Sequence, residues 1–528
     1  DCQMHTRIIK IYQFTAVLIL AGLVCQPVSA SSVRRGLGPE PDSLDIHQAR
    51  GLAAVNLLRD VREGLVTFDV NGEPVPGQAL SWQVLDNGKR YRFTLRPEAR
   101  WSNGDPVSAA DFVRAWHRAL SPATTAATAG LLKDIHNAAE ILRGEAEVKD
   151  LGISAVDSGV VEIVLREPAP WILEILAHPV SFPLHASGLD EPRNAPLNGP
   201  YLISEWTPRA SIRLDRNPHY HALDSVSVQT IEYFPIEEPA AELARYRSGE
   251  LHITETIPAG RFSWLQENLP EDLRVHPYLG TFWLGLNLRH QALGYSRDLR
   301  QALSLAIDRE ILTRTVLGAG ELPAWTVVPP GMSAYQPAAM AESVLSQQER
   351  EAQARRLFER SGFGLNEPLL LELRYNTSAV HRRVAVAVSA MWKQVLGVST
   401  QLVNEEWKVF VNNRKMGVVT EVFRGGWIAD YADPSSFLDL FVSDNSLNNT
   451  FYENSGYDMS MKSAAIASGK TRMQVLHQAE AQLMQDMPVI PLYYYVSRHL
   501  VSPALAGFAD NVRDIHLSRY LELEKKHP

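Results

Sequence analysis

The side chains best suited to chemistry lie together in residues 424–458, RGGWIADYADPSSFLDLFVSDNSLNNTFYENSGYD. Gly425, Gly426, Trp427 and a lone acid, Asp430, open this stretch, and aromatic and polar residues follow densely. A hydrophobic core disfavours so many polar groups, because burying an unpaired polar group costs free energy. The stretch therefore predicts the lining of a binding cleft. An acid in a cleft can bind a cation or take part in catalysis.

Catalysis is disfavoured by the motifs that the sequence lacks. It contains no G-x-S-x-G, H-E-x-x-H, G-x-x-x-x-G-K-[ST] or G-x-G-x-x-G string. The acid pairs Glu237-Glu238 and Glu405-Glu406 lie beside expected strand ends, where a solvated surface explains them, and the histidines are scattered. A catalytic triad need not be local in sequence, so a peptidase or amidase remains an alternative.

Composition and charge narrow the class of protein further. The chain has 528 residues, which suggests roughly three domains. Its composition, 45% apolar and 21% charged, is that of an ordinary globular protein. The net charge of −9 disfavours a nucleic-acid partner. No cysteine and histidine spacing typical of a zinc site is present, so we expect neither a metal nor another cofactor.

The first 30 residues resemble a secretory signal peptide. Arg7 and Lys10 supply a basic start, and residues 14–24 form a largely apolar run that is short for a membrane span. Small residues at alternate positions predict cleavage after Ala30. A lipid anchor on Cys25 is the alternative, but the residues before it fit a lipoprotein site poorly. We expect an exported protein whose mature chain has no thiol.

Helix and strand patterns are interleaved along the chain. Alternating apolar residues predict a strand over 91–95, and Ser108 with Asp111 resembles a capping box that opens a helix. Helical spacing recurs over 299–307, 384–395 and 473–487, with Gly397 ending the second of these helices. Strands are expected over 398–403 and 492–496. This alternation predicts an α/β fold.

Several ordered motifs resemble one family. Residues 100–107, RWSNGDPV, followed by DFV at 111–113, are similar to the signature of the family 5 solute-binding proteins of ABC importers. Further similar motifs run from 36 to 523, nearly the whole expected mature chain, and include GLGPEP at 36–41, RYRSGE at 245–250, YNTS at 375–378, EWK at 406–408, NNT at 448–450 and YYYV at 493–496. Within the family, the resemblance is greatest to periplasmic oligopeptide-binding proteins, including the murein-peptide binder.

The resemblance implies a class II periplasmic-binding-protein fold, in which two lobes and three domains close on the ligand by a hinge. After the signal peptide of residues 1–30, we expect domain I to comprise residues 31–70, 198–281 and 499–528. Domain II is expected over 71–197, and domain III over 282–498.

The resemblance also implies a function. Its members bind short peptides in extended form, much like an added strand, and deliver them to an ABC permease in the inner membrane. Hydrated side-chain pockets permit broad specificity. We expect a periplasmic monomer that binds no nucleic acid and catalyses no reaction. Binding of murein peptides for cell-wall recycling is the alternative within the same class.

The resemblance assigns roles to residues of the opening stretch. Asp430 matches the family acid that receives the peptide's α-amino group; capping of a nearby turn is the alternative. Gly426 and Trp427 are expected to form a wall against the ligand backbone, because glycine lets another chain approach closely. Asn448 is expected to bond to the ligand backbone, with a role in its own turn as the alternative.

Other matched residues are expected to surround the peptide. Side-chain pockets are implied for four aromatic residues, with packing in the hydrophobic core as the alternative for each: Tyr278, Trp283, Trp407 and Tyr495. Arg424 and His381 match family residues that meet the peptide's carboxylate, and Arg414 is a looser candidate; surface ion pairs are the alternative. Arg114 stands where close relatives carry tyrosine, and we hypothesise that it favours ligands with an additional carboxylate.

Overall fold

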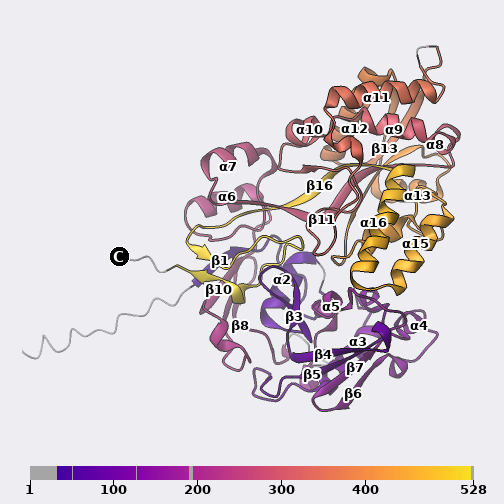
Figure 1. Cartoon of the computed structure of the whole chain (residues 1–528). Coiled ribbons are helices and arrows are strands. Elements are labelled where there is room, and N and C mark those ends of the chain that lie inside the picture. Colours follow the sequence, from indigo (N-terminus) through magenta and orange to yellow (C-terminus); the bar gives the residue numbers. More distant parts are fainter. Residues whose placement is uncertain (1–31, 50, 127, 189–193, 365, 525–528) are drawn as a thin grey trace, which may run out of the picture.

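The computed structural model describes residues 32–49, 51–126, 128–188, 194–364 and 366–524. The expected signal peptide, its cleavage site after Ala30 and the alternative anchor Cys25 lie outside these residues. Within the described ranges, no helix is long and apolar enough to cross a membrane. Figure 1 shows two lobes, one above the other, and each is built of mixed helix and strand, as expected of an α/β chain.

The lower lobe contains two four-stranded sheets, each with its own core. One sheet packs against α3 (Ala109–Leu120), and its strand order is β4 (Ala79–Leu85), β5 (Arg90–Leu95), β7 (Val160–Val164), β6 (Ile153–Asp157). The other packs against α2 (Gly51–Val61), and its order is β1 (Ser32–Gly36), β10 (Thr230–Phe234), β9 (Ser211–Arg216), β8 (Tyr201–Thr207). The second core also takes in apolar residues of the C-terminal segment, among them Val501 and Leu521.

The upper lobe is organised around a six-stranded sheet. Its order is β12 (Leu322–Pro323), β16 (Val489–Leu500), β11 (Leu273–Leu286), β15 (Val422–Ile428), β13 (Leu370–Asn376), β14 (Ser399–Glu405). Alternate residues of β11 enter different cores, because successive side chains of a strand point to opposite faces. Phe282 and Leu284 pack with α9 (Arg297–Leu305), α11 (Gln347–Arg360) and α12 (Ala379–Leu396). On the other face, Trp283 packs with α15 (Ser455–Ile466) and α16 (Gly469–Asp486).

Two long paired strands connect the lobes. β11 and β16 run antiparallel, with pairs from Leu273↔Leu500 to Gly285↔Val489 and a register shift between Pro277 and Thr281. Leu273 and Leu500 pack in the core around α6 (Pro239–Arg247) and α7 (Phe262–Asn268), whereas the opposite ends of both strands lie in the upper cores. Figure 1 shows both strands running between the lobes. Both strands therefore contribute residues to cores at each of their ends.

Local sequence signals account for several element boundaries. At the start of α3, the Asp111 carboxylate accepts hydrogen bonds from the Ser108 N–H (2.8 Å) and hydroxyl (3.0 Å), which confirms the predicted capping box. α12 ends at Gly397, whose φ of 73° is readily adopted by glycine. The predicted strands at 91–95 and 492–496 are confirmed as parts of β5 and β16.

The buried carboxylate of Glu480 connects three segments of the upper lobe by hydrogen bonds, and this leads to a prediction about stability. Its fully buried carboxylate accepts bonds from the Val328 N–H (2.9 Å), the Ala338 N–H (2.8 Å) and the Tyr335 hydroxyl (2.7 Å). Glu480→Ala leaves three buried donors unpaired, so we expect the free energy of unfolding to fall by about 3 kcal/mol or more. Urea denaturation followed by tryptophan fluorescence measures this change.

The matched control is Glu359→Ala on α11. Its side chain is exposed and forms no bond with the described residues, so its removal is expected to leave the urea midpoint almost unchanged. A Glu480→Ala protein that unfolds at the wild-type midpoint would show that the three donors are satisfied in another way.

Candidate functional site

One edge of β15 is left without a strand partner. β11 pairs with β15 along its whole length, from Leu286↔Val422 to Gly280↔Ile428. On the other side, β13 pairs only with Val422 and Phe423. Across the described residues, no strand pairs with the edge from Arg424 to Ile428. Such an edge offers a row of backbone donors and acceptors to another extended chain.

The register identifies which backbone groups face this open edge. The Ala429 N–H donates to the Leu279 carbonyl (2.8 Å), and the Asn287 N–H donates to the Glu421 carbonyl (2.8 Å). Odd-numbered residues of β15 therefore bond to β11, because hydrogen-bonded pairs alternate in an antiparallel ladder. The N–H and C=O groups of the even-numbered residues, Arg424, Gly426 and Ile428, face the open edge.

The two glycines of the stretch have different uses. A Cβ on Gly425 would lie 2.3 Å from Nε1 of Trp283, so this glycine lets the indole lie across the strand. A Cβ on Gly426 would lie 3.0 Å from the Thr281 carbonyl oxygen and 3.3 Å from the Tyr495 hydroxyl. Gly426 therefore keeps the open edge beside Tyr495 free of a side chain.

A pocket of about 240 Å³ borders this edge and collects half of the predicted site residues. Its lining includes Trp283, Trp407, Arg414, Arg424, Gly426 and Trp427. The other residues of the wall were not assigned individual roles from the sequence, although all but Phe423 belong to the stretch predicted to line a cleft: Phe423, Gly425, Leu440, Phe441, Leu447, Asn449 and Thr450. Trp407 and Leu447 are about half exposed, so the pocket presents apolar surface to solvent. Such surface favours apolar parts of a ligand.

Positive charge accumulates in this pocket without an acid to balance it. Arg414 comes from α13 (Trp407–Met416) and Arg424 from β15, and neither forms an ion pair within the described part of the chain. The Nε atoms of both are buried without a hydrogen-bond partner there. Burial, aided by the charge of Arg424, lowers the pKa of Arg414 to about 10. Arg414 and Arg424 thus bring two positive charges to this pocket without an acidic partner in the described ranges.

His381 lies next to these cations, on the other side of Arg424. It is in the first turn of α12, its Nδ1 lies 2.9 Å from the Asn376 side-chain oxygen, and its ring contacts Phe282. Burial and the neighbouring Arg424 charge lower the pKa of His381 to about 4. His381 is therefore neutral at pH 7, and it can donate or accept a hydrogen bond but adds no positive charge.

Asp430 lies at the opposite end of the open edge, in a second pocket of about 180 Å³. Its carboxylate accepts no hydrogen bond and forms no ion pair within the described ranges, although Lys133 is near enough to act on it electrostatically. Burial raises the pKa of Asp430 above its ordinary value, and Lys133 opposes that rise. A cation brought to this carboxylate would stabilise its charged form.

The alternative role of Asp430, capping a turn, is taken by Asp433. Oδ1 of Asp433 accepts bonds from the Ser435 N–H (2.9 Å) and hydroxyl (2.6 Å). Arg472 holds the same buried carboxylate with bonds of 2.6 and 2.9 Å. Asp430 therefore does not cap this turn.

Two predicted residues have other partners in the structure. The Asn448 amide donates to the Tyr452 carbonyl (2.9 Å) and accepts from the Thr450 hydroxyl (2.8 Å), which is the turn role weighed as the alternative. Its side chain thereby holds the loop that carries Asn449 and Thr450 into the pocket. Arg114 lines neither pocket and forms an ion pair with Asp111 on α3.

The two predicted tyrosines lie on β11 and β16. Tyr278 lines the Asp430 pocket. Tyr495 is next to Arg424, and burial raises the pKa of its hydroxyl while Arg424 opposes the rise. Both tyrosines are therefore placed along the sheet that carries the open edge.

The lower lobe supplies the far wall of the Asp430 pocket. Its lining includes Leu52, Val55 and Arg59 of α2, together with Ile175 and His178. Contacts bind this wall to the Asp430 segment: Glu174 accepts from the Ala432 N–H (2.8 Å), and the Trp171 and Tyr431 rings stack at 4.9 Å. Sequence reasoning missed these residues, because they lie more than two hundred positions away and carry no local motif.

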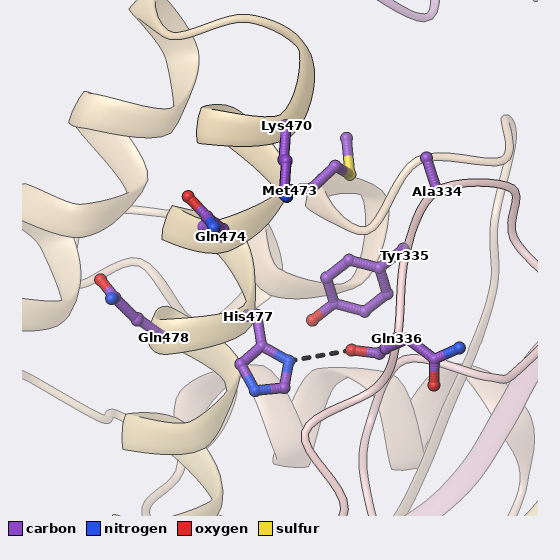
Figure 2. A pocket seen from close by; sticks show the side chains of 8 residues that line it. All are labelled: Ala334, Tyr335, Gln336, Lys470, Met473, Gln474, His477 and Gln478. Carbon is purple, nitrogen blue, oxygen red and sulfur yellow. Dashed lines mark hydrogen bonds between the residues drawn. The ribbon is translucent and has the colours of Figure 1, made fainter.

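A third hollow lies apart from the predicted residues. Figure 2 shows it between α16 and residues 334–336, where His477 Nδ1 lies 2.9 Å from the Gln336 carbonyl oxygen. Its volume is about 450 Å³. The residues that line it include neither an acid nor an arginine, in contrast to the two pockets along β15. Size alone therefore does not identify the functional site among the described residues.

The fold and the site define a two-lobed receptor with a cleft lined by charged and aromatic groups. Residues 73–449 match the model of the bacterial extracellular solute-binding proteins, family 5. This match covers more than half of the chain, and the chain belongs to this family. Its members are solute-binding proteins of transport systems. The resemblance found in the sequence motifs and the two-lobed fold implied by it are confirmed.

Individual proteins agree with this assignment. The chain is 36% identical to the periplasmic oligopeptide-binding protein OppA of Salmonella typhimurium, over 95% of this chain and 94% of that protein. It superposes on the unliganded open form of MppA, a periplasmic murein tripeptide-binding protein, with a TM-score of 0.88, 34% identity and coverage of 94% and 98%. Against Haemophilus influenzae OppA in complex with the peptide RPPGFSPFR, the TM-score is 0.70, with 31% identity and coverage of 94% and 99%.

Both structures are covered almost completely and at similar identity. The chain is structurally more similar to the unliganded open form of MppA than to the peptide complex of OppA.

The positive charge of Arg424 next to His381 leads to a prediction about the pKa of this histidine. In the wild type, His381 is expected to titrate near pH 4, and Arg424→Met is expected to raise its pKa, because one neighbouring cation is removed. Because the pKa of His381 is lower in the folded protein than in the unfolded chain, the unfolded chain binds the proton at a higher pH. This contribution to stability is therefore lost as the pH falls from about 6.5 towards 4. NMR titration of the imidazole measures both pKa values.

The outcome that contradicts this account is a wild-type His381 that titrates near 6.5. Arg382→Met, next to His381 in sequence and with an exposed side chain, is the control and should leave the pKa of His381 in place.

Proposed function

We propose that this chain is the periplasmic receptor of an ABC importer for short peptides with free termini. The observation that carries the proposal is the arrangement along β15: an unpartnered acid, Asp430, at one end of an open strand edge and unpaired arginines at the other. A zwitterionic chain in extended form satisfies all three features together. The relatives that bind oligopeptides support the same ligand class.

The backbone of the ligand is expected to add to the open edge. Arg424, Gly426 and Ile428 present N–H and C=O groups there, and an extended peptide can pair with them as a further strand. Six residue steps separate Arg424 from Asp430, which corresponds to roughly 20 Å of extended chain. A peptide held at both termini is therefore expected to have no more than about six residues.

The termini of the ligand are expected to balance the charges of the site. Asp430 receives the α-ammonium group, through charge-assisted bonds that are worth about 1.5–3 kcal/mol. Arg424 receives the carboxylate, with Arg414 beside it and neutral His381 as a further hydrogen-bonding group. Each interaction supplies a counter-charge to a group that has no ion-pair partner among the described residues.

Side chains of the ligand are expected to meet aromatic walls. Trp283, Trp407 and Trp427 line the pocket next to the arginines, and Tyr278 lines the pocket next to Asp430. Tyr495 lies beside Gly426 at the edge itself. Apolar and aromatic ligand side chains gain most from such walls, and the half-exposed Trp407 leaves room for water and for varied sequences.

We further propose the domain plan stated from the sequence, with β11 and β16 as the hinge. Five separate hydrophobic cores support it, and the cores exchange along these two strands near the expected boundaries at 281/282 and 498/499. Closure of the lobes would bring α2 and α5 (Ile172–Ile175) of the lower lobe over the peptide. The closed form is then the one that the permease recognises.

Location and assembly follow as part of the same proposal. Export through residues 1–30 would place the mature chain in the periplasm as a monomer, with the inner-membrane permease as its partner and no nucleic acid. We propose a carrier without catalysis; incubation with peptide followed by mass spectrometry would reveal cleavage if a peptidase activity existed.

Murein peptides remain the second candidate ligand. Two unpaired arginines in one pocket can accept more than one carboxylate, and the structural similarity to the murein tripeptide binder MppA is high. Arg114 does not support this alternative, because its guanidinium already pairs with Asp111. Native mass spectrometry of the purified protein identifies which ligand it carries.

The terminal contacts are tested by matching protein variants with modified peptides. N-acetylation of a bound peptide is expected to weaken binding to the wild type at least tenfold, and C-terminal amidation likewise. Asp430→Asn should make acetylation nearly neutral while leaving the amidation penalty, and Arg424→Met should show the converse. Calorimetric titration of all nine protein and peptide combinations gives the coupling for each terminus.

Asp444→Asn is the matched control, because Asp444 is an exposed acid of the same segment with no partner among the described residues. It should reproduce every wild-type affinity. Wild-type affinity that is insensitive to acetylation would overturn the role of Asp430, and equal penalties in all variants would show that the termini bind elsewhere.

A further inference from the structure

A second group of functional side chains lies away from the peptide cleft, where β16 enters the lower lobe. His499 is near the end of β16, and Asp514 and His516 belong to the segment between β17 (Leu505–Ala506) and β18 (Glu522–Leu523). Oδ1 of Asp514 lies 2.7 Å from His499 Nε2 and 3.0 Å from His516 Nε2. One candidate ligand atom from each of the three residues lies within 4.8 Å of the others.

The surroundings fix the orientation of both imidazoles. His499 Nδ1 lies 2.9 Å from the Thr254 carbonyl oxygen, which can only accept, so Nδ1 carries the proton and Nε2 points at Asp514. Metal-binding histidines are oriented by this kind of bond to a backbone carbonyl. The Phe508 ring stacks on His516 at 3.8 Å and contacts the His499 ring at 5.6 Å. Both Nε2 atoms thus converge on one carboxylate from rigid positions.

Charges around the cluster can accommodate a cation. Asp514 supplies one negative charge, and Glu255 lies close enough to act electrostatically on both His499 and Asp514. The Glu255 carboxylate forms no hydrogen bond or ion pair within the described ranges, and burial raises its pKa to about 7, while His499 and Arg35 oppose the rise. Arg35 opposes a cation, but its guanidinium is turned to the His516 carbonyl (2.9 Å) and the Ser518 hydroxyl (2.8 Å).

We propose that His499, Asp514 and His516 bind one divalent transition-metal ion, with zinc as the best match. Two imidazoles and one carboxylate are ligands that zinc accepts at about 2.0–2.2 Å, and a tetrahedral site with such bonds separates its ligand atoms by roughly 3.3 Å. The two hydrogen-bonded pairs need to open by less than about 1 Å to reach this geometry. Asp514 is only partly buried, so water can complete the coordination.

Metal binding replaces protons in this cluster. In the structure, each Nε2 is joined to Asp514 by a hydrogen bond, which requires a proton on that nitrogen. The metal displaces these protons, and its affinity therefore rises with pH. The ion would tie β16 to the C-terminal segment, beside Thr254 of the lower lobe, and so fix the base of one connecting strand. This inference is independent of which ligand the cleft binds.

The test uses tag-free, chelator-treated full-length protein and Zn²⁺ alone. We expect saturable binding of one Zn²⁺ per chain, a higher thermal midpoint with Zn²⁺, and binding weakened about tenfold or more by His516→Gln and by His499→Gln. His477→Gln, which removes an exposed histidine of α16, is the control and should bind like the wild type.

A measurement on the wild type alone tests the proposed metal site without depending on whether the variants fold. Co²⁺ in place of Zn²⁺ should give the strong visible absorption of a four-coordinate site, and Zn²⁺ should remove it. Absence of saturable Zn²⁺ binding, binding unchanged in both histidine variants, or only the weak spectrum of six-coordinate Co²⁺ would each overturn the proposal.

Discussion

The structure depends on one unsatisfied strand edge. β15 is held by β11 along its whole length, but β13 leaves it after Phe423. The backbone groups of Arg424, Gly426 and Ile428 therefore face an edge that no strand pairs with among the described residues. An unpaired edge invites aggregation unless it is short or covered. Here it is short, it borders two pockets, and the residues at its two ends carry opposite charges without ion-pair partners in the described ranges; the proposed ligand, a short zwitterionic chain, matches all three features.

The remaining architecture positions this edge. β11 sends alternate side chains into two cores, and these cores fix the β15 side chains relative to α12 on one face and α16 on the other. The same strand continues with β16 to the lower lobe, whose α2 faces Asp430 across the second pocket. Asp433, which pairs with Arg472, caps the turn next to Asp430. Binding groups are thus kept free of internal partners by neighbours that satisfy the local fold.

Much of this arrangement could be read from the sequence, and some could not. Periodicity and capping signals located β5, α3 and α12, because these depend on neighbouring residues. The motifs indicated Asp430 and Arg424 as binding residues, and the structure leaves both without an acid or base partner in its described part. Asn448 illustrates the limit: an amide in a polar stretch fits a ligand contact and a turn equally well.

The lower-lobe residues were beyond sequence reasoning for a different reason. Arg59, Glu174 and Arg513 reach the Asp430 pocket only after segments from distant parts of the chain assemble. The same holds for the cluster of His499, Asp514 and His516, which shows no metal-binding spacing in the sequence. Contacts of long sequence separation have no local signature, so periodicity cannot report them.

The central claim is that one extended peptide satisfies the open edge and both of its charged ends. A crystal structure of the protein with its natively carried ligand tests this claim most directly. The account predicts closed lobes, peptide backbone paired with Gly426, an α-ammonium group within hydrogen-bond distance of Asp430 and a carboxylate at Arg424. A ligand bound elsewhere, or a peptide in the cleft with the β15 edge still unpaired and Asp430 still without a cation, would contradict it.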